Sequence, residues 1–407
     1  MTPASLPMPA ATLDRFQRLS VTAGALGLGL TVVLGFLNPA DAFRGWLYAF
    51  LFWSGVALGC LSLCLIHNLT GGMWGLAVRR LMEAGTRTFP VLAVLFLPLV
   101  FGLKTLFVWA DPEVVKGDAL LLHKAPYLNT PFFLARAVFY FAIWVLVAHL
   151  VNSWSRRLDA GTDLKLERKT RSLGGLGLVL LGLTITFASV DWAMSLNPHW
   201  FSTIWGVMFM VGQVLSALCL LVILLARLGE EEPLRAVTRK GTVHDLGKLM
   251  LAFTMLWAYL HLSQFLIIWS GNIAEETPFY LARLHGAWKA MAFVLLLFHF
   301  VVPFLLLLSR DLKRNARSLA TLALVLLVLR FVDLYWLIGP DLAGHHGGEG
   351  GGHAGLGLPL ACAAAALGVG GAWLWAFFGA LKDRPILPVG DPEIRELLAR
   401  PAAAEAH

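Results

Sequence analysis

The chain has 407 residues, of which 58% are hydrophobic and only 14% are charged, and its mean hydropathy is +0.73. A soluble protein of this length does not have this balance, so the composition excludes one. The formal net charge of +7 is dispersed over several loops and both tails, which argues against binding to nucleic acid.

Ten apolar stretches predict ten membrane-spanning helices. A bilayer core about 30 Å thick needs about 20 apolar residues per helix. Backbone groups in lipid must be hydrogen-bonded within their own segment, which favours helices. The fold class is therefore an all-α polytopic membrane protein. Its predicted spans are 20–37, 45–66, 89–109, 131–151, 172–190, 202–226, 247–269, 286–309, 317–338 and 356–380.

The first span allows two interpretations. Arg15 and Arg18 precede it and Ala40-Asp41-Ala42 follow it, a pattern that is also typical of a signal peptide. Cleavage there would leave nine spans. We favour a retained first helix within 20–43, after a cytoplasmic tail that covers residues 1–19.

Two heptads near the outer ends of spans 4 and 8 nearly repeat each other. Thr130–Arg136 and Thr277–Arg283 are identical except that Phe133 in the first corresponds to Tyr280 in the second. They lie 147 residues apart, which is about the length of four membrane-spanning helices with their connections. The repeat predicts two four-helix bundles, formed by spans 2–5 (44–190) and 6–9 (191–338). Both heptads follow an outer loop and start a helix that runs inward, so the two halves form a parallel repeat. Span 1 and span 10 (356–381) flank them.

Within each heptad, the threonine is expected to cap the helix and the proline to occupy its first turn. Arg136 and Arg283 then lie near the outer interface. Two interpretations remain open for them: long side chains that reach the aqueous boundary, or partners in ion pairs.

The basic residues predict the orientation. Of the 32 lysines and arginines, 24 lie in the two tails and in the connections 67–88, 152–171, 227–248 and 310–317, whereas four lie in the opposite loops. Because Lys and Arg accumulate on the cytoplasmic side, both termini are predicted to be cytoplasmic.

The remaining segments carry weaker signals. The outer loop 339–355 contains three histidines among glycines, which can bind a metal weakly, but we interpret it as a flexible, solvated loop. The four cysteines lie in spans without haem-attachment or iron–sulfur spacing, so no metal site is predicted. The cytoplasmic tail 382–407 is polar, with a short amphipathic piece around residues 391–400.

Ionisable side chains in lipid are costly and are explained by pairing or by function. Several such residues lie in the predicted spans or at their ends. From the inner mouth through mid-depth to the outer mouth they are His67, Glu83, His149, His261, Lys289, His299, Arg330, Asp333 and Asp191.

Two pairs among them have alternative interpretations. Arg330 and Asp333 are three residues apart on one helix and are predicted to pair, either as a structural salt bridge or as part of a proton relay. His261 and His299 are predicted to lie at similar depth in one bundle, so they can be hydrogen-bonded core histidines, proton carriers, or ligands of a haem.

Four strings along the chain resemble a known family. They are HNLTGGMWG (67–75), RRLMEAG (79–85), SVDWAMSLNPHWFSTIWG (189–206) and WAYLHLSQFLIIWSGNIAEETPFY (257–280). With them the chain resembles, from about Leu19 to Leu381, the ActF family of subunits of bacterial alternative complex III, a quinol:cytochrome c oxidoreductase.

The resemblance implies a ten-helix NrfD-like fold with two four-helix bundles, in the bacterial cytoplasmic membrane. It implies partner subunits: a sister subunit of the same NrfD-like fold, an iron–sulfur subunit and multihaem cytochromes. This chain would carry no redox centre and no covalently bound cofactor. Quinol or quinone from the membrane pool would bind near this subunit or near its sister.

The resemblance also implies two roles for residues. In the sister subunit the quinol site uses an acid and a histidine that follows a Gly-Trp pair. Here Asp191 retains the acid, but Trp200 is followed by Phe201, which weakens the expectation of a separate quinol-oxidising site. The candidates for the quinone region are Asp191, Trp192, His199 and Trp200. The second role is a proton path through the ionisable residues named above.

The expected function is thus a subunit of a respiratory oxidoreductase that scaffolds the complex, contributes to the quinone region and conducts protons, without being catalytic alone. Two alternatives belong to other classes. Ten spans with an internal repeat also suit a secondary transporter, although no corresponding pair of spans is broken at mid-membrane by Gly or Pro. A b-type cytochrome would use His261 and His299.

Overall fold

The computed structural model describes residues 10–161, 163–344, 357–382 and 384–399. These residues form helices and turns without any strand, and ten helical segments among them are long and apolar enough to cross a membrane. For the described part of the chain, this confirms the prediction of an all-α fold with ten helices of the length and composition that a membrane crossing needs. The His-rich stretch of the outer loop lies outside the described residues.

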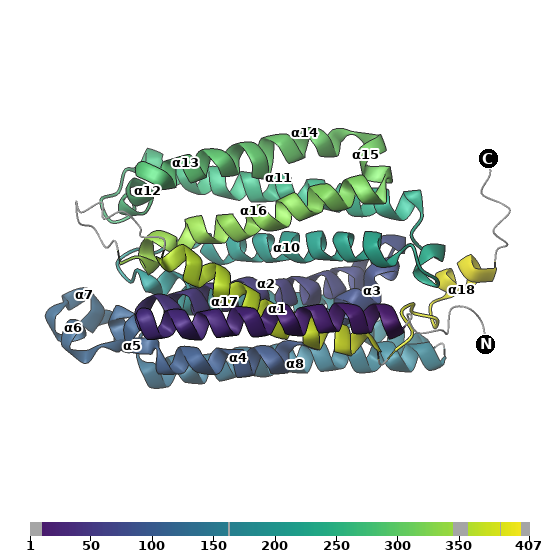
Figure 1. Cartoon of the computed structure of the whole chain (residues 1–407), viewed down its shortest axis with the longest axis horizontal. Coiled ribbons are helices and arrows are strands. Elements are labelled where there is room, and N and C mark those ends of the chain that lie inside the picture. Colours follow the sequence, from purple (N-terminus) through teal and green to yellow (C-terminus); the bar gives the residue numbers. More distant parts are fainter. Residues whose placement is uncertain (1–9, 162, 345–356, 383, 400–407) are drawn as a thin grey trace.

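The long helices run side by side along the long axis of the molecule (Figure 1). The spans are α1 (Ala10–Leu37), α2 (Pro39–Thr70), α3 with α4 (Met73–Thr86, Phe89–Phe101), α8 (Thr130–Ala160), α9 (Leu164–Trp192), α10 (Trp205–Leu228), α11 (Lys240–Gly271), α13 with η5 and α14 (Gly286–Val294, Leu295–Val301, Val302–Leu308), α16 (Ala316–Leu342) and α17 (Gly357–Lys382). Short helices connect them or follow them: α5 (Leu103–Leu106), η2 (Val108–Ala110), α6 (Pro112–Gly117), α7 (Ala119–Lys124), η3 (Met194–Leu196), η4 (Leu234–Ala236), α12 (Pro278–Arg283), α15 (Arg310–Arg314) and α18 (Pro392–Ala399).

The helices α2 and α10 form the centre of the molecule. In their most apolar windows, 89% and 78% of the residues are buried, against 22% in α1 and in the span built from α13 to α14. The two central helices approach closely, since a Cβ atom on Gly59 would lie 2.2 Å from the carbonyl oxygen of Gln213. They are the second and sixth spans, so each would begin one half of the predicted repeat. The division into two parallel four-helix bundles remains a prediction.

The third span begins earlier than predicted. Residues 67–88 were expected to form a cytoplasmic connection, but the chain reverses at Gly71 and Gly72, whose φ angles are 67° and 98°, and is helical again in α3. Glycine adopts such positive φ angles without strain. From Gly75 to Thr86 every residue of α3 is buried. The predicted boundary was wrong because the continuous apolar stretch begins only after these residues, whereas their charges are paired inside the protein.

The eighth span contains a π-helical segment, Leu295–Val301. Pro303 follows it. A proline has no N–H to donate to the carbonyl four residues earlier, and its ring crowds that carbonyl in an α-helix. The residue four positions earlier is His299, so the wider π turn relieves the conflict at this histidine. Such segments are often found at functional sites.

Glycines let α1 and α17 cross with their backbones in contact. A Cβ atom on Gly27 would lie 2.3 Å from the backbone nitrogen of Gly368, and one on Gly371 would lie 2.2 Å from the Cα atom of Gly24. Small residues permit this close approach of membrane helices. The first helix is thereby held against the last one.

We predict that Gly27→Ala destabilises the protein. The added methyl group meets backbone atoms of α17 that cannot rotate away, and overpacking of this kind costs about 1–3 kcal/mol. Thermal unfolding of the detergent-solubilised protein would show a lower midpoint. The control is Gly29→Ala on the same helix, where an added Cβ has no atom within 4 Å. Equal midpoints for the two variants would contradict the proposed contact.

Candidate functional site

The two ends of the bundle are called outer and inner after the predicted orientation. At the outer end of the first half, Arg136 is bound to a buried carboxylate. Its Nε and Nη2 atoms donate to the two oxygens of Asp191 at 2.8 and 2.9 Å. The hydroxyl of Tyr140 donates to the same carboxylate at 2.7 Å. Asp191 is fully buried and Arg136 nearly so. Of the two interpretations of this arginine, ion pairing is therefore confirmed.

Arg283 makes the equivalent pair in the second half. Its Nη2 atom donates to Asp341 at 2.6 Å, and its other nitrogens donate to the carbonyls of Trp336 and Phe279 at 3.1 and 2.9 Å. The two ion pairs join residues 55 and 58 positions apart. Asp341 was not predicted as a partner, although its distance of 150 residues from Asp191 is close to the spacing of the heptads.

The heptads share one more contact. The guanidinium carbon of Arg136 lies 4.3 Å from the centroid of the Phe132 ring, and that of Arg283 lies 3.6 Å from the centroid of the Phe279 ring. Both rings occupy the third position of their heptad, one turn before the arginine. A cation over an aromatic face is stabilised by the ring quadrupole. The two heptads therefore fold into the same local arrangement.

The predicted threonine cap is wrong for the first heptad and confirmed in position for the second. The helix α8 is capped by Asn129, whose side chain accepts from the backbone N–H of Phe132, and Thr130 is already helical. Thr277 is the N-cap residue of α12, although its side chain makes no capping hydrogen bond, and α12 is a six-residue helix separate from α13. In both helices the proline lies in the first turn, as predicted. The sequence pattern did not distinguish the two because the asparagine lies just outside the heptad.

A second cluster of polar groups lies among the long helices of the second half. Arg330 donates to the carboxylate of Asp333, which confirms the predicted pair. Trp257 Nε1 donates to the same carboxylate at 3.2 Å. The imidazole rings of His261 and His299 lie 4.4 and 4.3 Å from the Trp257 ring, measured between centroids. The five residues come from α11, η5 and α16, and we call them the His299 cluster.

The His299 cluster is incompletely hydrogen-bonded. His299 and Asp333 are fully buried. A buried polar atom without a partner costs free energy, so it is normally paired with protein or water. Among the described residues, the cluster contains buried side-chain atoms with no protein partner: both ring nitrogens of His299, His261 Nε2, Asp333 Oδ1 and Arg330 Nε, together with the neighbouring Thr254 Oγ1.

The shape of α10 makes room for this cluster. A Cβ atom on Gly212 would lie 1.9 Å from Nη2 of Arg330, so only glycine leaves space for the guanidinium there. The first half has no counterpart to the pair. Asp333 and Arg330 lie eight and eleven residues before Asp341, whereas the same offsets before the first-half aspartate give Leu183 and Leu180. At these positions the second half therefore carries an ionisable pair, whereas the first half carries two leucines.

At the inner end, Glu83 accepts hydrogen bonds from three arginines. Arg79 Nε, Arg80 Nη1 and Arg384 Nη1 lie 2.9, 2.6 and 3.1 Å from its oxygens. Arg79 Nη1 also donates to His67 Nδ1 at 3.0 Å. His67 Nε2 must then carry the ring proton of the neutral imidazole, and it lies 3.1 Å from the carbonyl oxygen of Gly72. The sequence analysis named His67 and Glu83 but missed the arginines as their partners.

Each of the four candidates for the quinone region has its own protein partner. Asp191 is bound to Arg136, and Trp192 packs against Trp144 in the first half. Trp200 stacks on Phe279 with ring centroids 4.2 Å apart. His199 is more than half exposed and Nε2 lies 2.7 Å from Asp118.

Asp118 joins the short helices after the third span to the segment after α9. The pKa of its carboxyl is held below the usual range, first by the backbone N–H of Leu121 and then by His199. Nearby, Lys124 Nζ donates to the carbonyl of Pro198 at 2.5 Å. These contacts hold α7 over the outer connection.

Two further candidates lie apart from every cluster. His149 is exposed on α8, and Lys289 is exposed on α13, only three residues from the start of that helix. The prediction that Lys289 lies at mid-depth with His299 is wrong, because the helix begins at Gly286 and the lysine faces outward. Neither side chain has a hydrogen bond or ion pair to another described residue in this structure.

The described residues contain no group of three or more His, Cys, Asp and Glu side chains arranged to hold a metal ion. All four cysteines are buried and unpaired. The imidazoles and carboxylates of these clusters can act as acids and bases beside the positively charged arginines. Comparisons with protein-family models and with curated proteins gave no match for this chain.

We predict that Asp341→Asn strongly destabilises the protein. It would leave the fully buried Arg283 without its carboxylate, and breaking a buried pair on one side costs about 3–5 kcal/mol. Chemical or thermal unfolding in detergent measures the change. The control is Glu113→Gln, because the side chains of the Lys116–Glu113 pair are 68% and 79% exposed and exposed pairs contribute little. Similar losses for both variants would contradict a special role of the buried pair.

Proposed function

We propose that this chain is the haem-free membrane subunit of a respiratory quinol:cytochrome c oxidoreductase of the alternative complex III type, and that its second half conducts protons. The observation that carries the proposal is His299, a fully buried imidazole whose two nitrogens have no protein partner. Unsatisfied ionisable groups at this depth are costly and are retained for function. The resemblance of the four sequence strings supplies the kind of complex.

Proton transfer suits the His299 cluster better than a purely structural role. A structural ion pair in a core is expected to have its remaining oxygens and nitrogens satisfied. Here Asp333 Oδ1 and Arg330 Nε lack protein partners, so these atoms are available to water. An imidazole and a carboxylate with water between them can pass a proton in either direction.

The clusters at the ends of the first half have a different character. Asp191 and Glu83 each accept at least two charge-assisted hydrogen bonds from arginines or a tyrosine. Such bonds hold each carboxylate in a fixed position between its donors. We therefore assign these two carboxylates to scaffolding, and the proton path to the half that holds His299.

The proposal includes partners and location. The outward faces of α11 and of the span built from α13 to α14 are mostly apolar, since only 28% and 22% of their most apolar windows are buried. These faces would meet lipid and the NrfD-like sister subunit. The iron–sulfur and multihaem subunits would lie on the outer side, with both termini of this chain in the bacterial cytoplasm and quinol supplied by the membrane pool.

The decisive experiment separates electron transfer from proton transfer in the intact complex. After mild extraction, an iron–sulfur protein and multihaem cytochromes should copurify with this chain. In proteoliposomes, Asp333→Asn and His299→Gln are expected to retain quinol-dependent cytochrome c reduction while lowering the number of protons translocated per electron. His149→Gln is the matched control, because this exposed histidine lies outside the His299 cluster.

Three outcomes would contradict the proposal. An unchanged proton-to-electron ratio in both variants would remove the proton role. Purification of the chain without redox partners, together with solute uptake in vesicles, would favour a transporter. A Soret band of the isolated chain that His261→Ala or His299→Ala abolishes would identify a b-type cytochrome.

A further inference from the structure

The segment after α17 crosses the inner ends of α3 and α8. Ile386, Leu387 and Ile394 are buried to 2%, 0% and 0% exposure. Gly390 lies against the end of α8, where a Cβ atom would come within 2.0 Å of the carbonyl oxygen of Leu158. We call residues 384–394 the C-terminal strap. Its apolar side chains and its close backbone contact fix it on the inner surface of the molecule.

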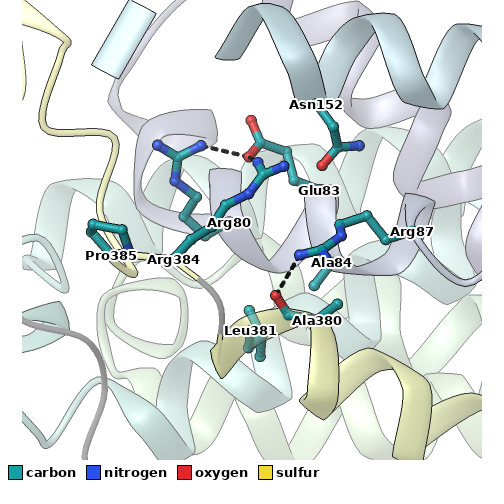
Figure 2. A pocket seen from close by; sticks show the side chains of 9 residues that line it. All are labelled: Arg80, Glu83, Ala84, Arg87, Asn152, Ala380, Leu381, Arg384 and Pro385. Carbon is teal, nitrogen blue, oxygen red and sulfur yellow. Dashed lines mark hydrogen bonds and ion pairs between the residues drawn. The ribbon is translucent and has the colours of Figure 1, made fainter. Parts of the chain in front are cut away.

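The strap inserts one charged side chain into the protein. Arg384 Nη1 donates to Glu83 at 3.1 Å, and the side chains of the pair are only 9% and 2% exposed. Figure 2 shows Arg384 and Arg80 reaching the carboxylate of Glu83. Because Arg79 and Arg80 already donate to this carboxylate over shorter distances, Arg384 is not needed to neutralise it.

Arg384 is held in an unfavourable electrostatic setting. Burial and the positive charges of Arg156, Arg80 and Arg87 together lower the pKa of its guanidinium to about 10, against the attraction of Glu83. Like charges at short range repel each other most strongly where water is scarce. Of the three contacts to Glu83, the one made by the strap is therefore the easiest to break.

A small cavity lies where the strap meets the helices (Figure 2). Its volume of about 10 Å³ is about the space that one water molecule needs. Three of the atoms on the lining residues are buried without a protein partner: Arg80 Nε, Arg384 Nε and Asn152 Oδ1. One water can accept a hydrogen bond from a guanidinium and donate one to Asn152 Oδ1. The orientation of this amide is set by Nδ2, which donates to Thr86 and Ala148, so Oδ1 remains available to the water.

We infer that the C-terminal strap is a gate: when Arg384 leaves Glu83, the strap lifts and bulk water enters the cavity beside Glu83 and Asn152. The apolar contacts of Ile386 and Leu387 keep the strap closed at rest. Opening is local, since Arg79 and Arg80 of the same helix still donate to Glu83 when Arg384 has left. The gate regulates access to the inner end of the molecule, and this holds whether or not the chain conducts protons.

The test places a reporter thiol in the cavity. Ala84 lines it and is 3% exposed, so Ala84→Cys is labelled by a small water-soluble methanethiosulfonate only when the strap opens. Losing a hydrogen bond between charged groups shifts an opening equilibrium by about tenfold or more. Adding Arg384→Gln to Ala84→Cys is therefore expected to raise the labelling rate about tenfold, in the full-length protein with its partner subunits present.

Two kinds of control separate opening from unfolding. Arg157→Gln removes an exposed cytoplasmic-side arginine that has no contact with Glu83, and it should leave the rate unchanged. The four buried native cysteines, Cys60, Cys64, Cys219 and Cys362, report on the bundle as a whole. No acceleration by Arg384→Gln would overturn the gate. Acceleration at all four native cysteines would also overturn it, since the change would then be global loosening.

Hydrogen exchange of the unmodified protein gives an independent measurement. A gate requires that amides of residues 384–394 exchange faster than those of the adjoining part of α17, because local opening precedes unfolding of the helix. Exchange of both segments at one rate would mean that the strap opens only with the whole bundle, which would overturn the proposal without any variant.

Discussion

The pairing of arginine with carboxylate inside a low-dielectric protein is the interaction on which the rest of this structure depends. Arg136 with Asp191 joins α8 to α9, and Arg283 with Asp341 joins α12 to α16. An unpaired charge at these positions would be prohibitively costly. Each pair therefore fixes the rotation and height of the helices that carry it, and the apolar packing around α2 and α10 fills the space between.

Against this background of paired charges, the His299 cluster is the exception. Its carboxylate is bound by Arg330 and Trp257, yet the second oxygen and both nitrogens of His299 have no protein partner among the described residues. The π-helical turn places the histidine there, and Gly212 leaves the space that the arginine occupies. Two local departures from regular helix packing thus converge on one group of polar atoms, which is the pattern expected of a functional site.

How far the sequence could predict this site depended on the distance between partners along the chain. Arg330 and Asp333 were predicted to pair because three residues on a helix bring side chains together. The heptads predicted that Arg136 and Arg283 are equivalent, but not that their partners lie 55 and 58 residues away. Arg384 contacts a residue 301 positions earlier, and nothing in the local pattern indicates it. For α3 the sequence misled, since the continuous apolar stretch begins only after this charged segment, which is nonetheless buried.

By itself the sequence determined the class of the protein, the number of its membrane-length helices and the repeat of the two heptads. These follow from composition, segment length and local identity, and such properties need no knowledge of neighbours in space. Only the tertiary structure decided which charges are neutralised, which polar atoms stay unsatisfied, and which of the named candidates, such as His149 and Lys289, face outward. The physical reason is that the cost of a buried charge depends on what packs against it, and in this bundle the neighbours come from distant helices.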